Sequence, residues 1–390
     1  MNKKLAAQLV AILSDLIALP SPYPPGTSVE ICAYAARRLQ KAGYKVETAA
    51  RQKGVDNVVA HLKGKARGPV IAFNAHVDTV GVGERTNWQS DPFTARIKGG
   101  LVYGLGAGNC KGSMAVQLWL AEEIARRGGP ATGELVFTFV ADEENLGPEG
   151  MAFLRKSGKV RPDALILGAQ TENNLIVAER GVMWARLTTK GKAAHAGNPG
   201  AGDNAILRMM RLVGALSSYY DKALATRRAG AMRSTVNVGT FHGGHNTNVV
   251  PAACTVEIDR RLLPDEKVTD AFAELKRVVD GVGEPKSQVK IEFLTGTNGF
   301  FAPENGRTVA AFEAVVNKQT GRRVKFLNAT GVSDGRYYAD DGIEIINFGP
   351  GSGAEGHAAN ESVPIAEMVE AAEIQLEVIE KLLSLSPLPR

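Results

Sequence analysis

The chain has 390 residues, which is too long for one simple core, so we expect two domains. With 44% apolar and 22% charged residues, the composition is typical of a soluble globular protein. The net charge is +5, but the basic residues are scattered, which argues against nucleic acid as a partner. The three cysteines have no metal-binding spacing and are odd in number, so we expect a reducing, cytoplasmic environment without disulfides.

The N-terminal segment has apolar residues at helical spacing over 4–19. Gln8 and Asp15 interrupt its apolar run, which favours an amphipathic helix over a signal peptide. No segment approaches the length of a membrane-spanning helix, so we expect no membrane partner. The elements predicted next are a second amphipathic helix and two strands, over 28–42, 45–49 and 57–62.

A short buried strand is predicted over 69–75, because Val70 to Phe73 are apolar and follow a Gly-Pro pair. His76 and Asp78 stand where this strand would end, on one face of an extended backbone. Asp78 can hold the imidazole in one tautomer while the other ring nitrogen faces a metal. Since sites in open α/β sheets form beyond the carboxyl ends of strands, a metal site is one interpretation. A surface histidine beside a capping aspartate is the other.

Helices and strands alternate up to residue 167, and this alternation indicates a parallel α/β sheet. Asn109 lies in a glycine-rich loop, and Glu143-Glu144 follows the next predicted strand. Adjacent carboxylates on an extended segment point in different directions, so one can bind a metal while the other acts as a general base. The predicted elements are a hairpin at Gly99-Gly100, the loop 103–112, helices 113–127 and 148–157, and strands 134–140 and 164–167.

From about residue 180 the pattern changes to β-α-β-β-α-β, the order of a ferredoxin-like domain. Its predicted elements are strands 182–190, 234–241, 249–261 and 287–294 and helices 203–220 and 265–280. We therefore predict that 181–295 forms an inserted lid or association domain, while 1–180 and 296–390 form the first domain. The first domain would end with helix 303–319, a loop over 330–336, strand 343–348, a loop to His357 and helix 364–384.

Several motifs follow one another along nearly the whole chain: Asn74-Ala-His76-Val-Asp78-Thr-Val80, Tyr103-Gly-Leu-Gly-Ala-Gly-Asn-Cys-Lys-Gly112, Ala141-Asp-Glu-Glu144, Gly191-Lys-Ala-Ala-His195-Ala-Gly197, Asn248-Val-Val-Pro251, Asp259-Arg-Arg261 and Gly356-His-Ala-Ala-Asn-Glu361. In these motifs and their order the chain resembles the M20 family of metallopeptidases and amidohydrolases. That family includes acetylornithine deacetylase, succinyl-diaminopimelate desuccinylase, the glutamate carboxypeptidases and the aminoacylases. The resemblance implies an α/β fold, namely a zinc-exopeptidase-like mixed-sheet catalytic domain with an inserted ferredoxin-like α+β lid or dimerisation domain.

The resemblance also implies a dinuclear site for zinc, cobalt or manganese. In that pattern His76 and an acidic residue hold one metal, while Glu144 and His357 hold the other. An aspartate bridges the two metals at the position of Asn109, and Glu143 is the general base and proton shuttle.

In the inserted domain, the resemblance implies that His195 reaches the active site of a second subunit and steadies the oxyanion. This role implies a homodimer through 181–295. Asn248 and Arg261 resemble positions that bind a substrate carboxylate. His245 lies beside this segment; it is either an additional substrate contact or part of an ordinary polar loop.

The chain departs from the family pattern at the metal site. Asn109 replaces the bridging aspartate, and Ala169 stands where the family has the first-site carboxylate. Glu172 follows three positions later and is a possible replacement. His76, Glu144 and His357 would still form a two-histidine, one-glutamate set, which is sufficient for hydrolytic zinc. We therefore predict a reduced site with one divalent metal, zinc, manganese or cobalt, per chain.

The sequence thus predicts a metal-dependent hydrolase that cleaves an amide-type C–N bond in a small carboxylate-bearing substrate. Metal-activated water would be the nucleophile, with Glu143 as general base. One alternative is hydrolysis of a non-peptide C–N bond, such as that of an aromatic amine. Another is a catalytically silent binding protein of the same fold. Asn109 and Ala169 favour the silent protein, whereas the retained base and oxyanion donor argue against it.

Overall fold

The structure is a computed structural model that describes residues 2–302, 305–329 and 331–383. The chain forms two compact units. The first contains residues up to Val177, Ala302–Leu327 and residues from Ser333 onward, and the second contains Ala178–Phe301 and Asn328–Val332. The predicted inserted domain, 181–295, falls within the second unit. The parts of predicted elements at residues 303, 304, 330 and 384 lie outside the described residues.

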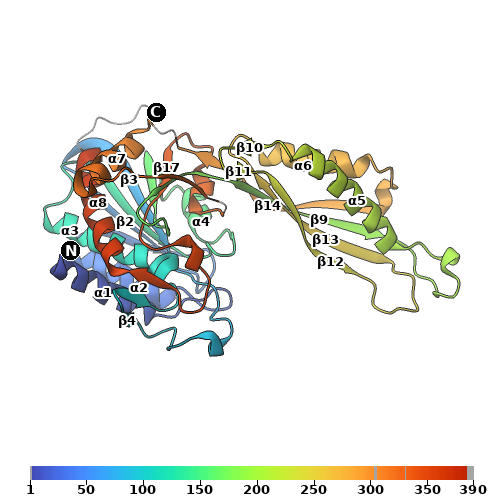
Figure 1. Ribbon diagram of the computed structural model, residues 1–390, viewed down its shortest axis with the longest axis horizontal. Helices are drawn as coiled ribbons and strands as arrows, with labels where there is room; N and C mark the ends of the chain where they lie inside the picture. Colours follow the sequence, from blue (N-terminus) through green and yellow to red (C-terminus); the bar gives the residue numbers. More distant parts are fainter. Residues whose placement is uncertain (1, 303–304, 330, 384–390) are drawn as a thin grey trace. The chain divides into compact units, whose positions relative to one another are not determined.

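The main sheet is mixed and, within the described residues, has nine strands (Figure 1). Its order is β1-β2-β6-β3-β7-β17-β8-β15, and β16 also pairs with β8. The strands are β1 (Lys45–Ala49), β2 (Asn57–Lys63), β3 (Ala66–His76), β6 (Thr132–Val140), β7 (Ala164–Leu167), β8 (Leu175–Glu179), β15 (Phe300–Phe301), β16 (Phe326–Ala329) and β17 (Glu344–Asn347).

The expectation of a parallel sheet is right only for the centre of the sheet. There β3 pairs in parallel with β6 and β7, and β17 pairs in parallel with β7. Outside the centre, β1, β2, β8 and β15 pair with their neighbours in antiparallel fashion. The mixed-sheet fold class is therefore confirmed, and the alternation of helices and strands did not reveal the antiparallel edges.

Helices pack against this sheet, and their bounds lie within a few residues of those predicted. They are α1 (Lys3–Ile17), α2 (Val29–Lys41), α3 (Ser113–Arg126), α4 (Met151–Lys156), α7 (Arg307–Thr320) and α8 (Ile365–Leu383). A small separate sheet contains β4 (Arg96–Lys98), β5 (Leu101–Tyr103) and β18 (Ser362–Pro364). Short helical turns span Arg85–Asn87, Ala107–Gly112, Asp334–Tyr338 and Gly353–Glu355.

Strand β3 is anchored by the side chains of one face and carries polar groups on the other. Ile71, Phe73 and Ala75 belong to the apolar cluster that the sheet forms with α1, α3 and α8. The ring of Phe73 stacks on that of Phe137, with centroids 5.1 Å apart. Because side chains alternate along a strand, Asn74 and His76 lie on the opposite face. The packing of one face of β3 therefore fixes the positions of Asn74 and His76 on the other face.

The second unit has its own sheet and core. Its elements are β9 (Gly181–Lys190), α5 (Ala205–Ala223), β12 (Thr235–Gly243), β13 (Ala253–Leu262), α6 (Val268–Asp280) and β14 (Val289–Thr297), with short turns at Pro199–Ala201 and Lys286–Gln288 and a small hairpin of β10 (Arg228–Ala229) and β11 (Met232–Arg233). The sheet order is β12-β13-β9-β14, and all pairs are antiparallel. Met209 and Leu212 of α5 and Leu275 of α6 pack with the sheet in one apolar cluster. The ferredoxin-like arrangement is confirmed.

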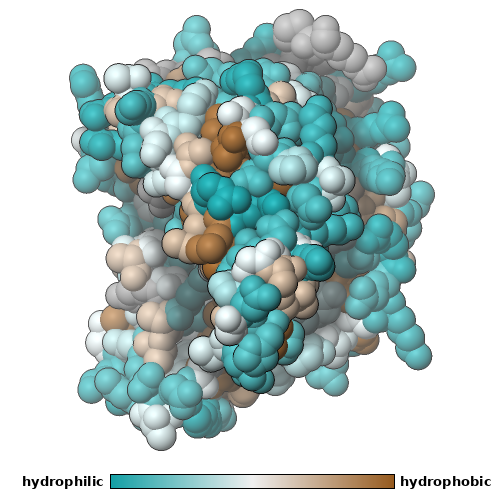
Figure 2. All heavy atoms as spheres, turned by 90° about the vertical axis from the view of Figure 1, so that its right-hand side faces the viewer, coloured by the Kyte–Doolittle hydropathy of each residue, from teal (hydrophilic) through white to brown (hydrophobic). Residues whose placement is uncertain are grey.

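Among the described residues, no helix has both the length and the apolar character needed to cross a membrane. The face shown in Figure 2 is covered mostly by hydrophilic residues. Apolar residues appear on that face as small separate patches. This distribution is ordinary for the surface of a globular protein.

Candidate functional site

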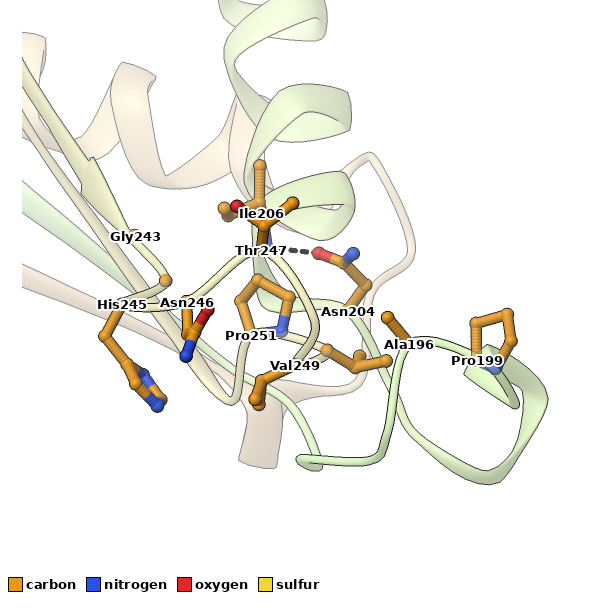
Figure 3. A pocket seen from close by; sticks show the side chains of 12 residues that line it. Ala196, Pro199, Asn204, Ile206, Gly243, His245, Asn246, Thr247, Val249 and Pro251 are labelled. Atoms are coloured by element: carbon orange, nitrogen blue, oxygen red, sulfur yellow. Dashed lines mark hydrogen bonds between the residues drawn. The ribbon is translucent and has the colours of Figure 1, made fainter.

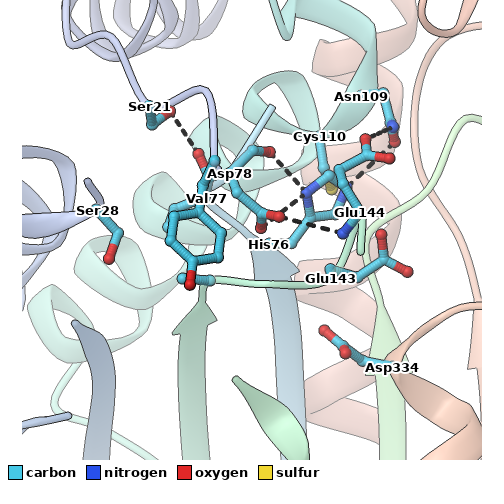
Figure 4. Close-up of polar contacts among 12 residues, drawn as sticks. Ser21, Ser28, His76, Val77, Asp78, Asn109, Cys110, Glu143, Glu144 and Asp334 are labelled. Carbon is cyan, nitrogen blue, oxygen red and sulfur yellow. Dashed lines mark hydrogen bonds and ion pairs between the residues drawn. The ribbon is translucent and has the colours of Figure 1, made fainter. Parts of the chain in front are cut away.

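The candidate site lies where the parallel strands β3 and β6 end side by side. His76 is the last residue of β3 and pairs with Val140 of β6. Asp142 then turns the chain with a left-handed φ of 66°, and Glu143 and Glu144 follow it. His76, Glu143 and Glu144 each offer one ligand atom, and these atoms lie within 4.8 Å of one another (Figure 4). Such a group is a candidate for holding a divalent metal.

Asp78 fixes the orientation of both His76 and Glu144. The Nδ1 of His76 lies 2.9 Å from the backbone oxygen of Asp78 and 3.6 Å from its Oδ1. The backbone N–H of Glu144 donates to Asp78 Oδ2 at 3.1 Å. With Nδ1–H donating to the backbone oxygen of Asp78, Nε2 is the ring nitrogen that faces the site. Asp78 is fully buried, so solvent does not compete for these contacts.

Asn109 lies at the centre of the site, in the turn Ala107–Gly112. Its Oδ1 is 3.2 Å from His76 Nε2, and its Nδ2 is 2.6 Å from Glu144 Oε1 and 3.0 Å from His357 Nε2. The NH2 of the amide is the group beside Glu144, where it donates to Oε1. The single amide oxygen of Asn109 therefore faces His76.

His357 lies on the loop before β18, with a left-handed φ of 65° and a side chain that is 52% exposed. Its Nε2 is 2.9 Å from Glu144 Oε1. This hydrogen bond raises the pKa of His357 above its ordinary value. His357 is not one of the three residues whose ligand atoms gather around His76. Instead, Oε1 of Glu144 accepts hydrogen bonds from both His357 and Asn109. These contacts leave Oε2 of Glu144 for another ligand.

Glu143 is largely buried, with 12% of its side chain exposed. Burial raises the pKa of Glu143 to about 8, although the charges of His76 and Arg336 act in the opposite direction. The guanidinium of Arg336 lies 3.3 Å from Glu143 Oε1. A carboxylate with a raised pKa is suited to accepting a proton near neutral pH.

The donor atoms near His76 are compatible with a divalent metal. Ligand atoms bound tetrahedrally to zinc at about 2.0–2.2 Å lie roughly 3.3 Å from one another. The nitrogen of His76 and the amide oxygen of Asn109 are 3.2 Å apart, and the carboxylates of Glu143 and Glu144 lie close by. The residues at this end of β3 therefore fit a bound cation in donor type and in spacing.

The other predicted site residues belong to the second unit. His195 is exposed, and its Nδ1 accepts the backbone N–H of Gly197 at 3.0 Å, so its Nε2 carries the proton. The backbone oxygen of Asn248 accepts from Ala196 at 2.9 Å. Arg261 pairs with Asp259 of its own strand through two hydrogen bonds of 2.8 and 3.0 Å.

His245 lines a cavity between the loop after β12 and the start of α5, and Figure 3 shows its ring beside Asn246. The backbone N–H groups at the start of α5 are occupied, since Ile206 and Leu207 bond to the Asn204 side chain and Ala205 bonds to Pro251. The cavity is thus lined by loop residues and by an already capped helix end.

Comparison with known proteins identifies the family. The sequence profile of peptidase family M20/M25/M40 matches residues 72–381. The chain belongs to this family. It is therefore an M20-type metallohydrolase that acts on amide-type bonds and depends on a divalent metal.

Related proteins align with this chain over nearly its whole length. Succinyl-diaminopimelate desuccinylase from Bordetella petrii is 29% identical over 385 residues, covering 96% of this chain and 98% of the relative. The enzyme of the same name from Legionella pneumophila is 28% identical over 387 residues, covering 96% of this chain and 99% of the relative.

Solved structures show the same fold. The M20 family metallo-carboxypeptidase Sso-CP2 from Sulfolobus solfataricus has a TM-score of 0.79 at 19% identity, covering 97% of this chain and all of that one. YXEP from Bacillus subtilis, described as a dinuclear metal-binding peptidase of the M20 family, has a TM-score of 0.74 at 18% identity. The comparison with YXEP covers 98% of this chain and 99% of YXEP.

The sequence did not point to Gln170, whose side chain lies between two loops of the M20 site. A Cβ placed on Gly108 would lie 2.3 Å from Gln170 Nε2, and one on Gly356 would lie 2.9 Å from its Oε1. Gln170 thus fills the space between the loops that carry Asn109 and His357. Glu172, the possible replacement for the missing carboxylate, is exposed and is not one of the residues that gather around His76.

We expect Asp78→Asn to weaken divalent metal binding by about 10–100-fold, because the partners that orient a ligand tune its affinity. Titration calorimetry with zinc or manganese measures this change. Asp91→Asn is the matched control, since Asp91 is 47% exposed and pairs with Arg85. Equal affinities for the Asp78 variant and the wild type would contradict the orienting role.

Proposed function

We propose that this M20 hydrolase cleaves the amide bond of a small N-acyl amino acid and uses one divalent metal per chain. The observation that supports one metal is the amide of Asn109. Its Nδ2 lies against both Glu144 and His357, and an amide nitrogen that donates hydrogen bonds offers no lone pair to a cation. A carboxylate could supply one oxygen to each of two metals, whereas Asn109 supplies one oxygen in all.

In this proposal the metal ligands are His76, Asn109 through its oxygen, and Glu144 through Oε2. His357 holds Glu144 by the hydrogen bond to Oε1 and steadies the loop that carries it. Zinc, manganese and cobalt all accept such a set of nitrogen and oxygen donors. When bound, the metal polarises the substrate carbonyl and makes water a stronger nucleophile near neutral pH.

Glu143 is the proposed general base. It accepts a proton from the attacking water and passes that proton to the nitrogen that leaves as the C–N bond breaks. The products are a carboxylic acid and an amine, so the atoms of water are divided between them. Burial raises the pKa of Glu143, and a general base is most effective when its pKa lies close to the working pH.

The substrate is proposed to carry a carboxylate. The desuccinylases that are 28–29% identical to this chain act, by their names, on a succinylated diamino acid. We propose Asn248, Arg261 and His245 as carboxylate-binding residues. Arg261 uses Nε and Nη2 toward Asp259, which leaves Nη1 for a carboxylate oxygen.

We further propose a homodimer through the second unit. Strand β12 is an edge strand of the four-stranded sheet, and edge strands offer unpaired backbone groups to another chain. Val238 and Phe241 on β12 and Leu207 and Met210 on α5 are 40–56% exposed. His195, with its proton on Nε2, is the proposed hydrogen-bond donor to the oxyanion.

Hydrolysis of small N-acyl amino acids by the metal-loaded protein tests the proposed function. We expect N-succinyl and N-acetyl amino acids to be cleaved, and Glu143→Gln to lower kcat by about 10²–10⁴-fold, the usual contribution of a general base. Glu143→Gln should still bind metal, and elemental analysis checks this. Metal binding without turnover on any such substrate would favour a silent binding protein.

Light scattering at micromolar concentration tests the homodimer. We expect the wild type to be a dimer and Phe241→Asp to shift it toward monomer, because a charge would be buried in the apolar contact. Phe301→Asp is the matched control, since Phe301 is 60% exposed and lies on neither β12 nor α5.

His195→Ala should lower kcat far more than it lowers the metal content per chain, because His195 is proposed to contact the oxyanion and not the metal. A monomeric wild type, or a dimer unaffected by Phe241→Asp, would contradict the proposed interface.

A further inference from the structure

Arg336 is a buried cation that contacts the proposed base. It lies in the short helix Asp334–Tyr338, and its side chain is 1% exposed. Its Nη1 donates to Glu143 Oε1 at 3.3 Å. Ser333 caps this helix by accepting the N–H of Gly335. Capping does not explain why a guanidinium is buried beside the site.

The position of Arg336 is fixed by a chain of contacts that begins on β3. Asn74, two residues before His76, donates to Asp334 Oδ2 at 3.0 Å. Asp334 Oδ1 lies 3.9 Å from Arg336 Nη2. Strand β3 therefore positions His76 directly and Arg336 through Asn74 and Asp334.

A second set of contacts holds Arg336 from the other side. Its Nη2 donates to the hydroxyl of Tyr337 at 3.0 Å, and its guanidinium lies 4.5 Å from the centre of that ring. The Tyr337 hydroxyl donates in turn to the backbone oxygen of Gly147 at 2.8 Å. Gly147 belongs to the turn that begins at Asp142 and carries Glu143, since its N–H bonds to Asp142. Arg336 thus contacts the turn that carries the base by two routes, directly through Glu143 and through Tyr337 to Gly147.

The contacts of Arg336 favour a role at Glu143 over a role in stability alone. Its closest carboxylate oxygen is that of Glu143, at 3.3 Å, and Asp334 is farther away, at 3.9 Å. Within the described part of the chain, Arg336 Nε is buried without a hydrogen-bond partner. A guanidinium placed only to stabilise the fold would be expected to satisfy its donors.

We propose that Arg336 is a positioning residue for Glu143. By donating to Oε1 it holds the carboxylate in one orientation and leaves Oε2 to accept the proton from water. Asp334 and Tyr337 keep the guanidinium in place. This inference rests on the proposed role of Glu143 as general base.

The test compares Arg336→Gln and Arg336→Lys with the wild type in the metal-loaded protein. We expect Arg336→Gln to lower kcat by about 10²-fold, the effect of a misplaced catalytic group, with KM changed by less than about threefold. Arg336→Lys keeps the positive charge but not the forked donor geometry of the guanidinium. Its kcat should therefore lie between those of the wild type and Arg336→Gln. Metal content by elemental analysis should stay at the wild-type value in both variants.

Arg208→Lys is the matched control. Arg208 is 7% exposed and pairs with Glu284, which is 11% exposed, in the second unit. Its replacement should lower the thermal midpoint without lowering kcat. If Arg336→Gln does not fold, Arg336→Lys decides: a reduced kcat at unchanged KM and metal content supports the inference.

Wild-type kcat in either folded Arg336 variant would overturn the inference, as would a loss of activity that follows loss of metal. Glu143→Gln separates this failure from failure of the proposed function. An inactive Glu143→Gln beside fully active Arg336 variants rejects the positioning role alone. A fully active Glu143→Gln rejects the general base itself, and with it the proposed mechanism.

Discussion

The site depends on one constraint, the single amide oxygen of Asn109. This side chain contacts His76 on one side and both Glu144 and His357 on the other. Its two ends differ chemically, since one accepts and the other donates. The donor end binds Glu144 Oε1. In the proposed one-metal site, this end of the amide therefore offers no ligand to a second cation. The M20 framework is retained here, while the charge that would hold two cations beside each other is absent.

Strand β3 connects this site to the core of the fold. Ile71, Phe73 and Ala75 pack among the helices, so the alternate residues Asn74 and His76 are held on the opposite face with little freedom. His76 meets Asn109, and Asn74 reaches Asp334. A proposed metal ligand and the support of the proposed base therefore depend on the same packed strand. A change in its packing would disturb both.

The sequence was informative where the signal is local. The motifs around His76, Asn109, Glu143-Glu144 and His357 stand at the ends of predicted elements, and the structure brings these residues together. The pairing of strands was less predictable. The antiparallel edges of the sheet and the short strands β8 and β16 depend on neighbouring strands that cannot be identified from the local sequence pattern. Gln170 packs between Gly108 and Gly356, and Arg336 meets a residue 193 positions away. Contacts between such distant segments leave no periodic pattern in the sequence, so they are visible only in the folded structure.

The measurement that tests the account most directly is an anomalous diffraction map from crystals of the protein loaded with zinc or manganese. The account predicts one metal peak per chain in the first unit, bounded by His76, Asn109 and Glu144. A second peak of similar height between Glu144 and His357 would contradict it, because the amide nitrogen of Asn109 would then have to give up both of its contacts there.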